Sequence, residues 1–216
     1  YLLENLLKMD EEKNSLIYKI LRISFVYRAY QFIVIKRSTY KFIYQNIFKT
    51  NENSVVLDCG CGPAQYRKLI KSKKYIGIDF NPKHIQTAKK NYPNDIFYEG
   101  DLSKFNFQNI GKVTDILLFG LLHHLNDENA RNLINNLINQ LETTGQITAI
   151  DPVYVKKESF YDSFANFIAS KDQGNYVRKE NEYRELVNSK LATTETIIYK
   201  NLLRIPFYHH ILNIKI

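Results

Sequence analysis

Short apolar runs alternate with helical segments between residues 53 and 153, and this alternation constrains the fold more than any other feature of the chain. The runs are VVLDCG, YIGIDF, IFYEGD, TDILLFG and QITAIDP. Continuous apolar runs of this length, rich in β-branched residues, are typical of strands that are buried on both faces. Strands that alternate with helices predict a doubly wound, mostly parallel sheet. We therefore expect an α/β fold built on a seven-stranded sheet.

The segments on either side of this core predict further elements. Apolar residues recur at three- and four-residue steps through residues 2–50, which indicates helices. After the core, residues 158–171 and 179–190 are predicted to be helical, and residues 194–200 and 203–216 to form a closing antiparallel hairpin with Pro206 on an edge strand. No repeat or linker divides the chain, so we expect one domain, residues 1–216. Its predicted parts are an N-terminal helical lid (1–50), a core (53–153) and a substrate-side region (154–216).

Within the core, capping residues predict where helices begin and end. Asn81 and Pro82 suit the N-cap and first position of a helix, and Asn126 or Asp127 suits the N-cap of another. Gly145 is expected just past the end of that second helix. Residues 65–72 are predicted to form a short helix.

The net charge of +8 belongs to the two ends of the chain. Residues 51–151 contain eleven basic and eleven acidic side chains, whereas residues 1–50 carry a net +5 and residues 152–216 a net +3. Such a basic periphery suits an acidic substrate, RNA or an anionic membrane surface, and solubility alone is the competing explanation. No nucleic-acid-binding module is evident, so we do not expect a nucleic-acid partner. Peripheral membrane contact and the oligomeric state stay open.

Further sequence features bear on the compartment and on metal binding. No apolar run approaches the roughly 18 residues that cross a bilayer, and the acids near residue 1 argue against a secretory signal. Cys59 and Cys61 are too close for an easy disulfide, and no second pair completes a zinc site. We expect a cytoplasmic protein without a bound metal.

Gly60 and Gly62 follow the first apolar run directly, where glycine permits a tight turn and close approach of a ligand to the backbone. Asp79 ends the second run, 21 positions after Asp58, in the place of a carboxylate that accepts ribose hydroxyls. Asp101 follows the third run, within reach of an adenine amino group. Because the carboxyl ends of parallel strands share one edge, these acids predict a nucleoside site there. A nicotinamide-dependent oxidoreductase is one alternative, weakened by the missing third glycine.

These motifs together resemble the class I S-adenosylmethionine-dependent methyltransferases. The resemblance covers residues 53–153 and rests on VLDCGCGP, YIGIDFNPKHIQTAKK, YEGDL, DILLFGLLHHLND and GQITAIDP. The flanks YRAYQF and DQGNYVR are similar to a subgroup associated with sugar and polysaccharide biosynthesis. The resemblance implies methyl transfer to an oxygen or nitrogen of a small metabolite, with sugar or lipid-linked acceptors as candidates and an anionic one included. A non-catalytic S-adenosylmethionine-binding subunit is the second alternative.

Residue roles follow from the same resemblance. It implies cofactor contacts by Asp58, Gly60, Cys61, Gly62, Asp79, Phe80, Asp101, Leu102, Gly120 and Leu121. His123 and His124, after the fourth apolar run, are candidate general bases because the histidine pKa lies near neutrality. The candidate substrate contacts are Arg28, Tyr30, Gln31, Asp151, Tyr176 and Arg178. Packing and surface charge are competing explanations for the tyrosines and arginines.

Overall fold

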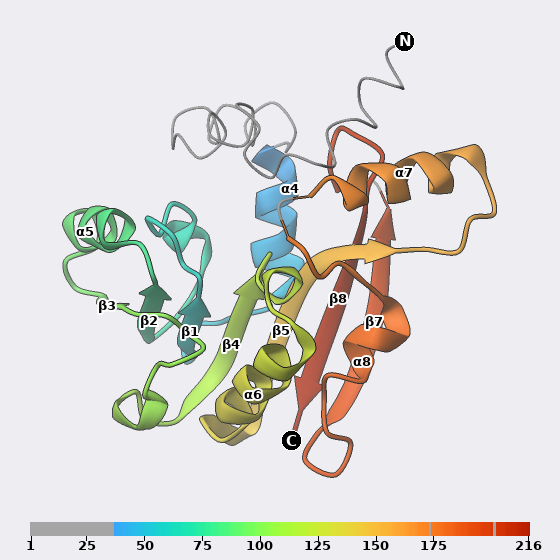
Figure 1. Ribbon diagram of the computed structural model, residues 1–216. Helices are drawn as coiled ribbons and strands as arrows, with labels where there is room; N and C mark the ends of the chain where they lie inside the picture. Colours follow the sequence, from blue (N-terminus) through green and yellow to red (C-terminus); the bar gives the residue numbers. More distant parts are fainter. Residues whose placement is uncertain (1–36, 173, 201) are drawn as a thin grey trace.

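The computed structural model describes residues 37–172, 174–200 and 202–216 (Figure 1). An eight-stranded sheet runs through this part of the chain in the order β3-β2-β1-β4-β5-β8-β7, with β6 paired to the end of β5. The strands are β1 (Val55–Cys59), β2 (Lys74–Asp79), β3 (Ile96–Glu99), β4 (Val113–Phe119), β5 (Leu141–Tyr154), β6 (Arg178–Lys179), β7 (Thr193–Lys200) and β8 (Tyr208–Lys215). The predicted α/β fold is confirmed, but the sheet has one strand more than the seven predicted. The two-residue strand β6, which pairs with Val153 and Tyr154, is too short to leave a periodic signal in the sequence.

Strands β1 to β5 pair in parallel, while β8 runs antiparallel to both β5 and β7. The predicted closing hairpin is therefore confirmed. The expected place of Pro206 on an edge strand is wrong, because β8 lies between two neighbours and begins only at Tyr208. Proline has no N–H to donate, so it is excluded from a strand that is bonded on both sides.

Helices cover both faces of the sheet and give a three-layer structure (Figure 1). They are α4 (Arg37–Phe42), the π turn η2 (Ile43–Ile47), α5 (Pro82–Asn91), α6 (Asp127–Ile138), α7 (Phe160–Ser170) and α8 (Glu180–Arg184), with short 3₁₀ turns η3 (Arg67–Leu69), η4 (Phe107–Asn109) and η5 (Leu122–His124). One buried cluster joins the sheet to α6 and α8, and a second joins its other face to α4, η2 and α5. These two cores hold the strand ends in fixed positions.

The predicted helix starts are confirmed by their caps. The Asn81 side chain accepts a hydrogen bond from Lys83 N, Pro82 occupies the first position of α5, and the Asn126 side chain accepts from Asn129 N at the start of α6. Residues 65–72 form only the single turn η3, shorter than predicted.

Gly145 is not a helix cap as predicted. Helix α6 ends at Ile138, and the β-branched Thr143 and Thr144 that follow already belong to β5. A Cβ at Gly145 would lie 3.0 Å from the carbonyl oxygens of Glu142 and Thr114. The glycine therefore allows β4 and β5 to approach each other closely, beside a register shift in their pairing.

In the predicted N-terminal lid, α4 and η2 confirm helical structure within the described residues. The rest of that segment, residues 1–36, lies outside them. Among the described residues, no helix has the length and apolar character that a membrane crossing requires.

Candidate functional site

The chain turns sharply at the carboxyl end of β1, as the two glycines predict. Gly60 and Gly62 adopt φ of +82° and +55°, a left-handed backbone conformation that glycine adopts without strain. Gly60 N and Cys61 N both donate to Ile78 O, at 2.8 and 3.1 Å, so the turn is fastened to β2. A Cβ at Gly62 would meet no atom within 4 Å, which leaves open space beside the backbone. The turn thus offers its backbone to a ligand.

Asp79 ties this turn to the end of β2. Its Oδ2 accepts a hydrogen bond from Gly62 N at 2.9 Å, and its Oδ1 accepts from Asn81 N at 2.9 Å. His84, on the first turn of α5, places Nδ1 3.2 Å from the same Oδ1. The sequence analysis did not predict His84, because this residue does not lie at the end of a strand. Its position five residues after Asp79 and three after the helix cap could have indicated it.

Asp58 lies beneath this turn, on the same edge of the sheet. Burial raises the pKa of Asp58 to about 6, against the effect of a hydrogen bond of 2.6 Å donated by the Tyr75 hydroxyl; the nearby charge of Asp79 raises it further. Burial also raises the thiol pKa of both Cys59 and Cys61, which are free thiols. The Asp58 carboxylate is therefore held inside the fold by Tyr75.

Asp101 reaches the same edge by a different geometry. Gly100 N donates to Asp79 O at 3.0 Å, which brings the end of β3 beside β2. The Asp101 carboxylate is exposed and accepts from Ser103 Oγ and N at 2.7 and 2.9 Å, and these bonds lower its pKa. Phe80 is 75% exposed next to Asp79, while the half-buried Leu102 packs against the core. The three acids thus follow three adjacent strands, but only Asp58 and Asp79 interact with each other.

The turn after β4 holds the two predicted histidines. Gly120 has φ +64° and donates its N–H to Ile150 O at 2.8 Å, and the chain passes through Leu121 into η5. His123 is buried there with both ring nitrogens engaged. Nδ1 lies 2.7 Å from Asp151 Oδ1, and Nε2 lies 3.0 Å from Asp172 Oδ1. Burial lowers the pKa of His123, but the two carboxylates outweigh it and raise the pKa to about 9.

His124 is in the opposite electrostatic state. Its ring is exposed, with its centroid 4.1 Å from that of His123. Partial burial, and after it the positive charge of His123, lower the pKa of His124 below its usual value. At neutral pH the adjacent rings therefore differ, with His123 protonated and His124 neutral.

Asp172, Gly174 and Tyr176 contact the η5 turn in ways that the sequence did not predict. Tyr176 N donates to His123 O at 2.9 Å, and a Cβ at Gly174 would lie 2.6 Å from that oxygen. Asp172 contacts His123, as described above, yet it was not among the predicted site residues. Its place at the start of the DQGNYVR stretch was its only sequence signal.

Arg178, a predicted substrate contact, forms its hydrogen bonds with other residues of the protein. Its guanidinium is buried and donates to Leu122 O at 2.9 Å, to Leu125 O at 2.6 Å, and through two nitrogens to Asp127 Oδ1. In this structure it braces the η5 turn rather than facing a ligand. Tyr176 is 41% exposed beside it, and Asp151 is buried against His123. Arg28, Tyr30 and Gln31 lie outside the described residues.

Two further histidines, His209 and His210, are buried in β8. Burial lowers the pKa of each to about 4, so both are uncharged at neutral pH. The ring of His210 stacks on Tyr183 at 4.9 Å. These histidines therefore belong to the core and carry no charge for an anion.

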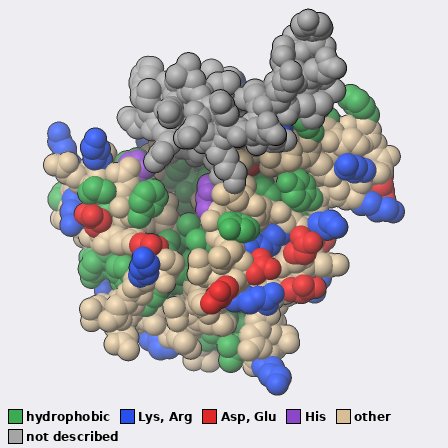
Figure 2. All heavy atoms as spheres, viewed as in Figure 1, with side chains coloured by type: hydrophobic (Ala, Val, Ile, Leu, Met, Phe, Trp, Pro, Cys, Tyr) green, Lys and Arg blue, Asp and Glu red, His purple; other side chains and the backbone are tan. Residues whose placement is uncertain are grey.

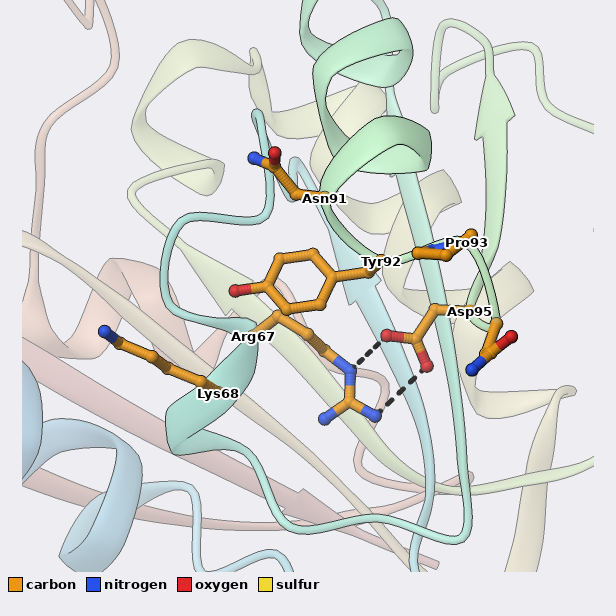
Figure 3. Close-up of a pocket in the computed structure, with 7 residues that line it drawn as sticks. Arg67, Lys68, Asn91, Tyr92, Pro93 and Asp95 are labelled. Atoms are coloured by element: carbon orange, nitrogen blue, oxygen red, sulfur yellow. Dashed lines mark hydrogen bonds and ion pairs between the residues drawn. The ribbon is translucent and has the colours of Figure 1, made fainter.

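A surface pocket of about 370 Å³ lies away from these residues, where α5 leads into β3 (Figure 3). Arg67 Nε and a terminal nitrogen bond the Asp95 carboxylate at 2.6 and 3.1 Å, and another nitrogen donates to Ile70 O. Ligands of open α/β sheets bind at the carboxyl ends of strands, whereas this pocket is at the amino end of β3. The ion pair there is a structural brace. Among the described residues, no cluster of histidine, cysteine and carboxylate side chains has the arrangement of a metal site.

Comparison with known proteins agrees with this geometry. Residues 56–145 match a family model described as a methyltransferase domain. No curated protein matches the sequence. Solved structures of other proteins share the fold, and three of them follow. The chain is 15% identical to the PH0226 protein of Pyrococcus horikoshii (91% of this chain, 98% of that chain, TM-score 0.63). It is 14% identical to a TehB-like SAM-dependent methyltransferase of Corynebacterium glutamicum (82% and 86%, TM-score 0.58).

The third is the N-methyltransferase NodS of Bradyrhizobium japonicum, to which the chain is 14% identical (82% and 94%, TM-score 0.61). The family match spans the glycine turn, all three strand-end acids and the histidine turn. A turn with open space beside Gly62, fastened to a carboxylate at the next strand end, fits an adenosyl cofactor. Residues 56–145 are thus a methyltransferase domain, on a fold that the chain shares with an S-adenosylmethionine-dependent methyltransferase.

Proposed function

We propose that the protein transfers the methyl group of S-adenosylmethionine to an oxygen or nitrogen of a small metabolite, with sugar or lipid-linked molecules as candidate acceptors. The hydrogen bond from Gly62 N to Asp79 Oδ2 is the observation that carries this proposal. It joins, in one rigid unit, the backbone that approaches the methionine part and the acid that accepts ribose hydroxyls. The nitrogen acceptor of the similar protein NodS supports an acceptor of this class.

The proposed cofactor contacts lie along the carboxyl edge from β1 to β4. Asp79 binds the ribose, with His84 holding its carboxylate in place. The exposed ring of Phe80 packs on the adenine, and Asp101 and Leu102 meet the adenine edge. Gly60, Cys61 and Gly62 line the methionine part, with Asp58 below them, and Gly120 and Leu121 pass beneath the sulfonium. The bound cofactor supplies an activated methyl group, so the protein's own task is to align the acceptor and exclude water.

We assign proton removal from the acceptor to His124. A general base must be unprotonated at the working pH, and the lowered pKa of His124 keeps it so. His123 does not meet this condition, because a pKa near 9 leaves it protonated between two carboxylates. His123, Asp151 and Asp172 instead fix the turn that presents His124.

Two measurements test this function. S-adenosylhomocysteine should raise the melting temperature of the protein by mass action, whereas NAD should not. A screen with tritium-labelled S-adenosylmethionine against sugar, lipid-linked and amine acceptors should then give labelled product. Stabilisation by NAD alone would favour the oxidoreductase alternative. Tight cofactor binding without product from any acceptor class would favour the non-catalytic subunit.

A further inference from the structure

Helix α7 carries its large apolar residues on the outside. Phe160, Phe164 and Phe167 are 87%, 44% and 39% exposed, and successive ring centroids along this phenylalanine stripe are 6.4 Å apart. Their spacing of four and three residues places them on one face of the helix. An ordinary surface helix turns its aromatic residues toward the core, so this orientation is reversed.

Polar residues of α7 face the protein instead. Asp162 accepts hydrogen bonds from the Tyr208 hydroxyl at 2.6 Å and from Glu158 N at 3.2 Å. The Asn166 side-chain amide accepts from Val155 N at 3.0 Å and donates to Val155 O at 2.8 Å. These bonds fix the rotation of the helix about its axis. The outward position of the stripe is therefore built into the fold.

Lysines surround the stripe. Lys156 and Lys157 are exposed just before α7, and Lys171 follows it with Nζ 5.8 Å from the Phe167 ring centroid. Lys200, from the neighbouring strand β7, places Nζ 4.0 Å from the ring centroid of Tyr161 on α7. The acids of residues 156–171 are Glu158, which pairs with Lys156 at 3.0 Å, and the buried Asp162. Figure 2 shows hydrophobic and basic side chains near each other over this end of the molecule.

We propose that the phenylalanine stripe of α7 docks the protein on an anionic lipid surface. Aromatic residues on one helix face, with lysines at both ends, are what binds a helix in the plane of a membrane interface. The lysines would meet anionic headgroups while the rings enter the acyl boundary. A second copy of this chain is a poorer occupant, because a symmetric contact would bring the same lysines against one another.

Docking at this face has a consequence for the site. Helix α7 follows β5 directly, and Asp172, two residues after its end, contacts His123. A membrane under α7 would therefore lie close to the η5 turn that carries His124. Insofar as the proposed methyl transfer holds, this position gives a lipid-linked acceptor direct access to His124.

Vesicle co-sedimentation of the full chain tests the docking surface. We expect the protein to sediment with vesicles of phosphatidylcholine mixed with phosphatidylserine, and far less with phosphatidylcholine alone. The double variant Phe160→Ser/Phe164→Ser should weaken this binding about tenfold or more, since it removes two rings from the interface. The variant Lys156→Ser/Lys157→Ser should weaken binding to the mixed vesicles only, and make it less sensitive to salt.

A matched control uses exposed apolar residues elsewhere on the surface. Leu191 and Ile197 are each 49% exposed, so Leu191→Ser/Ile197→Ser should leave vesicle binding unchanged. Equal loss in this control, or no sedimentation of the unaltered chain, would overturn the proposal. A concentration-dependent dimer that disappears in the Phe160→Ser/Phe164→Ser variant would assign the stripe to a second copy. S-adenosylhomocysteine binding by each variant reports on the cofactor site separately, so a failed docking test leaves the proposed function standing.

Discussion

The two halves of the carboxyl edge are built in different ways. At the ends of β1 and β2, the bond between Gly62 and Asp79 joins residues 17 positions apart, and both residues belong to recognisable motifs. At the ends of β4 and β5, His123 meets Asp151 across 28 positions, and Arg178 meets Leu122 across 56. The proposed cofactor half is thus a local construction, whereas the proposed acceptor half is assembled from distant segments. Contacts between residues close in the sequence can be recognised from short motifs, whereas contacts between distant segments depend on the packing of individual loops.

The largest expected effect tests the acceptor half. His124→Ala should lower kcat by about 100-fold or more, because the lost general base contributes roughly that much to proton transfer. Affinity for S-adenosylhomocysteine, measured by calorimetry, should stay unchanged. Activity of the unaltered enzyme should fall only at a pH below the ordinary histidine value of 6.5, since the pKa of His124 is lowered.

Added imidazole offers a specific control for this variant. Partial recovery of turnover by His124→Ala in imidazole buffer would identify the missing group as a base rather than a packing element. Full turnover by His124→Ala without imidazole would remove the general base from the proposed mechanism and leave alignment alone.

A smaller effect is expected in the cofactor half. Asp79→Ala should weaken S-adenosylhomocysteine binding by about 1.5–3 kcal/mol, or roughly tenfold to 150-fold, because hydrogen bonds to a charged group are lost. The matched control is Asp95→Ala, which removes a carboxylate of similar size from the Arg67 ion pair at the other edge of the sheet. Its affinity for the ligand should be unaltered.

Asp101→Ala sharpens the same measurement. Its carboxylate is exposed and bonded to Ser103, so we expect a smaller loss of affinity than for Asp79. If Asp101→Ala weakened binding more than Asp79→Ala did, Asp101 rather than Asp79 would make the stronger contact with the ligand.

The smallest effect on turnover is expected from Asp172→Asn, which alters the support of the turn and not the base. The pKa of His123 is about 9 in the folded protein and about 6.5 when unfolded. The clamp that Asp151 and Asp172 form around its ring therefore contributes about 3 kcal/mol of stability below pH 6.5. That contribution is lost as pH rises from about 6.5 through 9. In Asp172→Asn the folded-state pKa of His123 falls, so the loss of stability is smaller and is complete at a lower pH, while kcat declines by no more than about tenfold.

Urea unfolding between pH 6 and 9.5, with an NMR titration of His123, measures this difference. Glu158→Gln, an exposed acid away from the clamp, should reproduce the pH dependence of the unaltered protein. An identical His123 titration in Asp172→Asn would show that Asp172 does not hold the ring. The proposed acceptor half would then lack one of the main contacts that join its distant segments.

The positions of the strand-end acids were predicted from the sequence, and the contacts that the sequence did not predict share a cause. The strand-end positions of Asp58, Asp79 and Asp101 follow from hydrophobic runs that end at an acid, a signal contained in a few neighbouring residues. His84 and Tyr75 were missed because their partners lie on another element, so no local pattern marks them. Arg178 was predicted to contact a substrate because the sequence cannot show that a charged side chain is enclosed.

The amino-acid sequence by itself determined the strand and helix alternation, the glycine turn and the order of the acids along the sheet. Backbone conformation and burial of continuous apolar runs are local properties, so residue type and spacing are enough to specify them. Only the tertiary structure decided which of two adjacent histidines is protonated, that Arg178 braces a turn, and that α7 turns its phenylalanines outward. Each of these depends on charges or hydrogen-bond partners brought from distant parts of the chain, and such contacts exist only once the chain has folded.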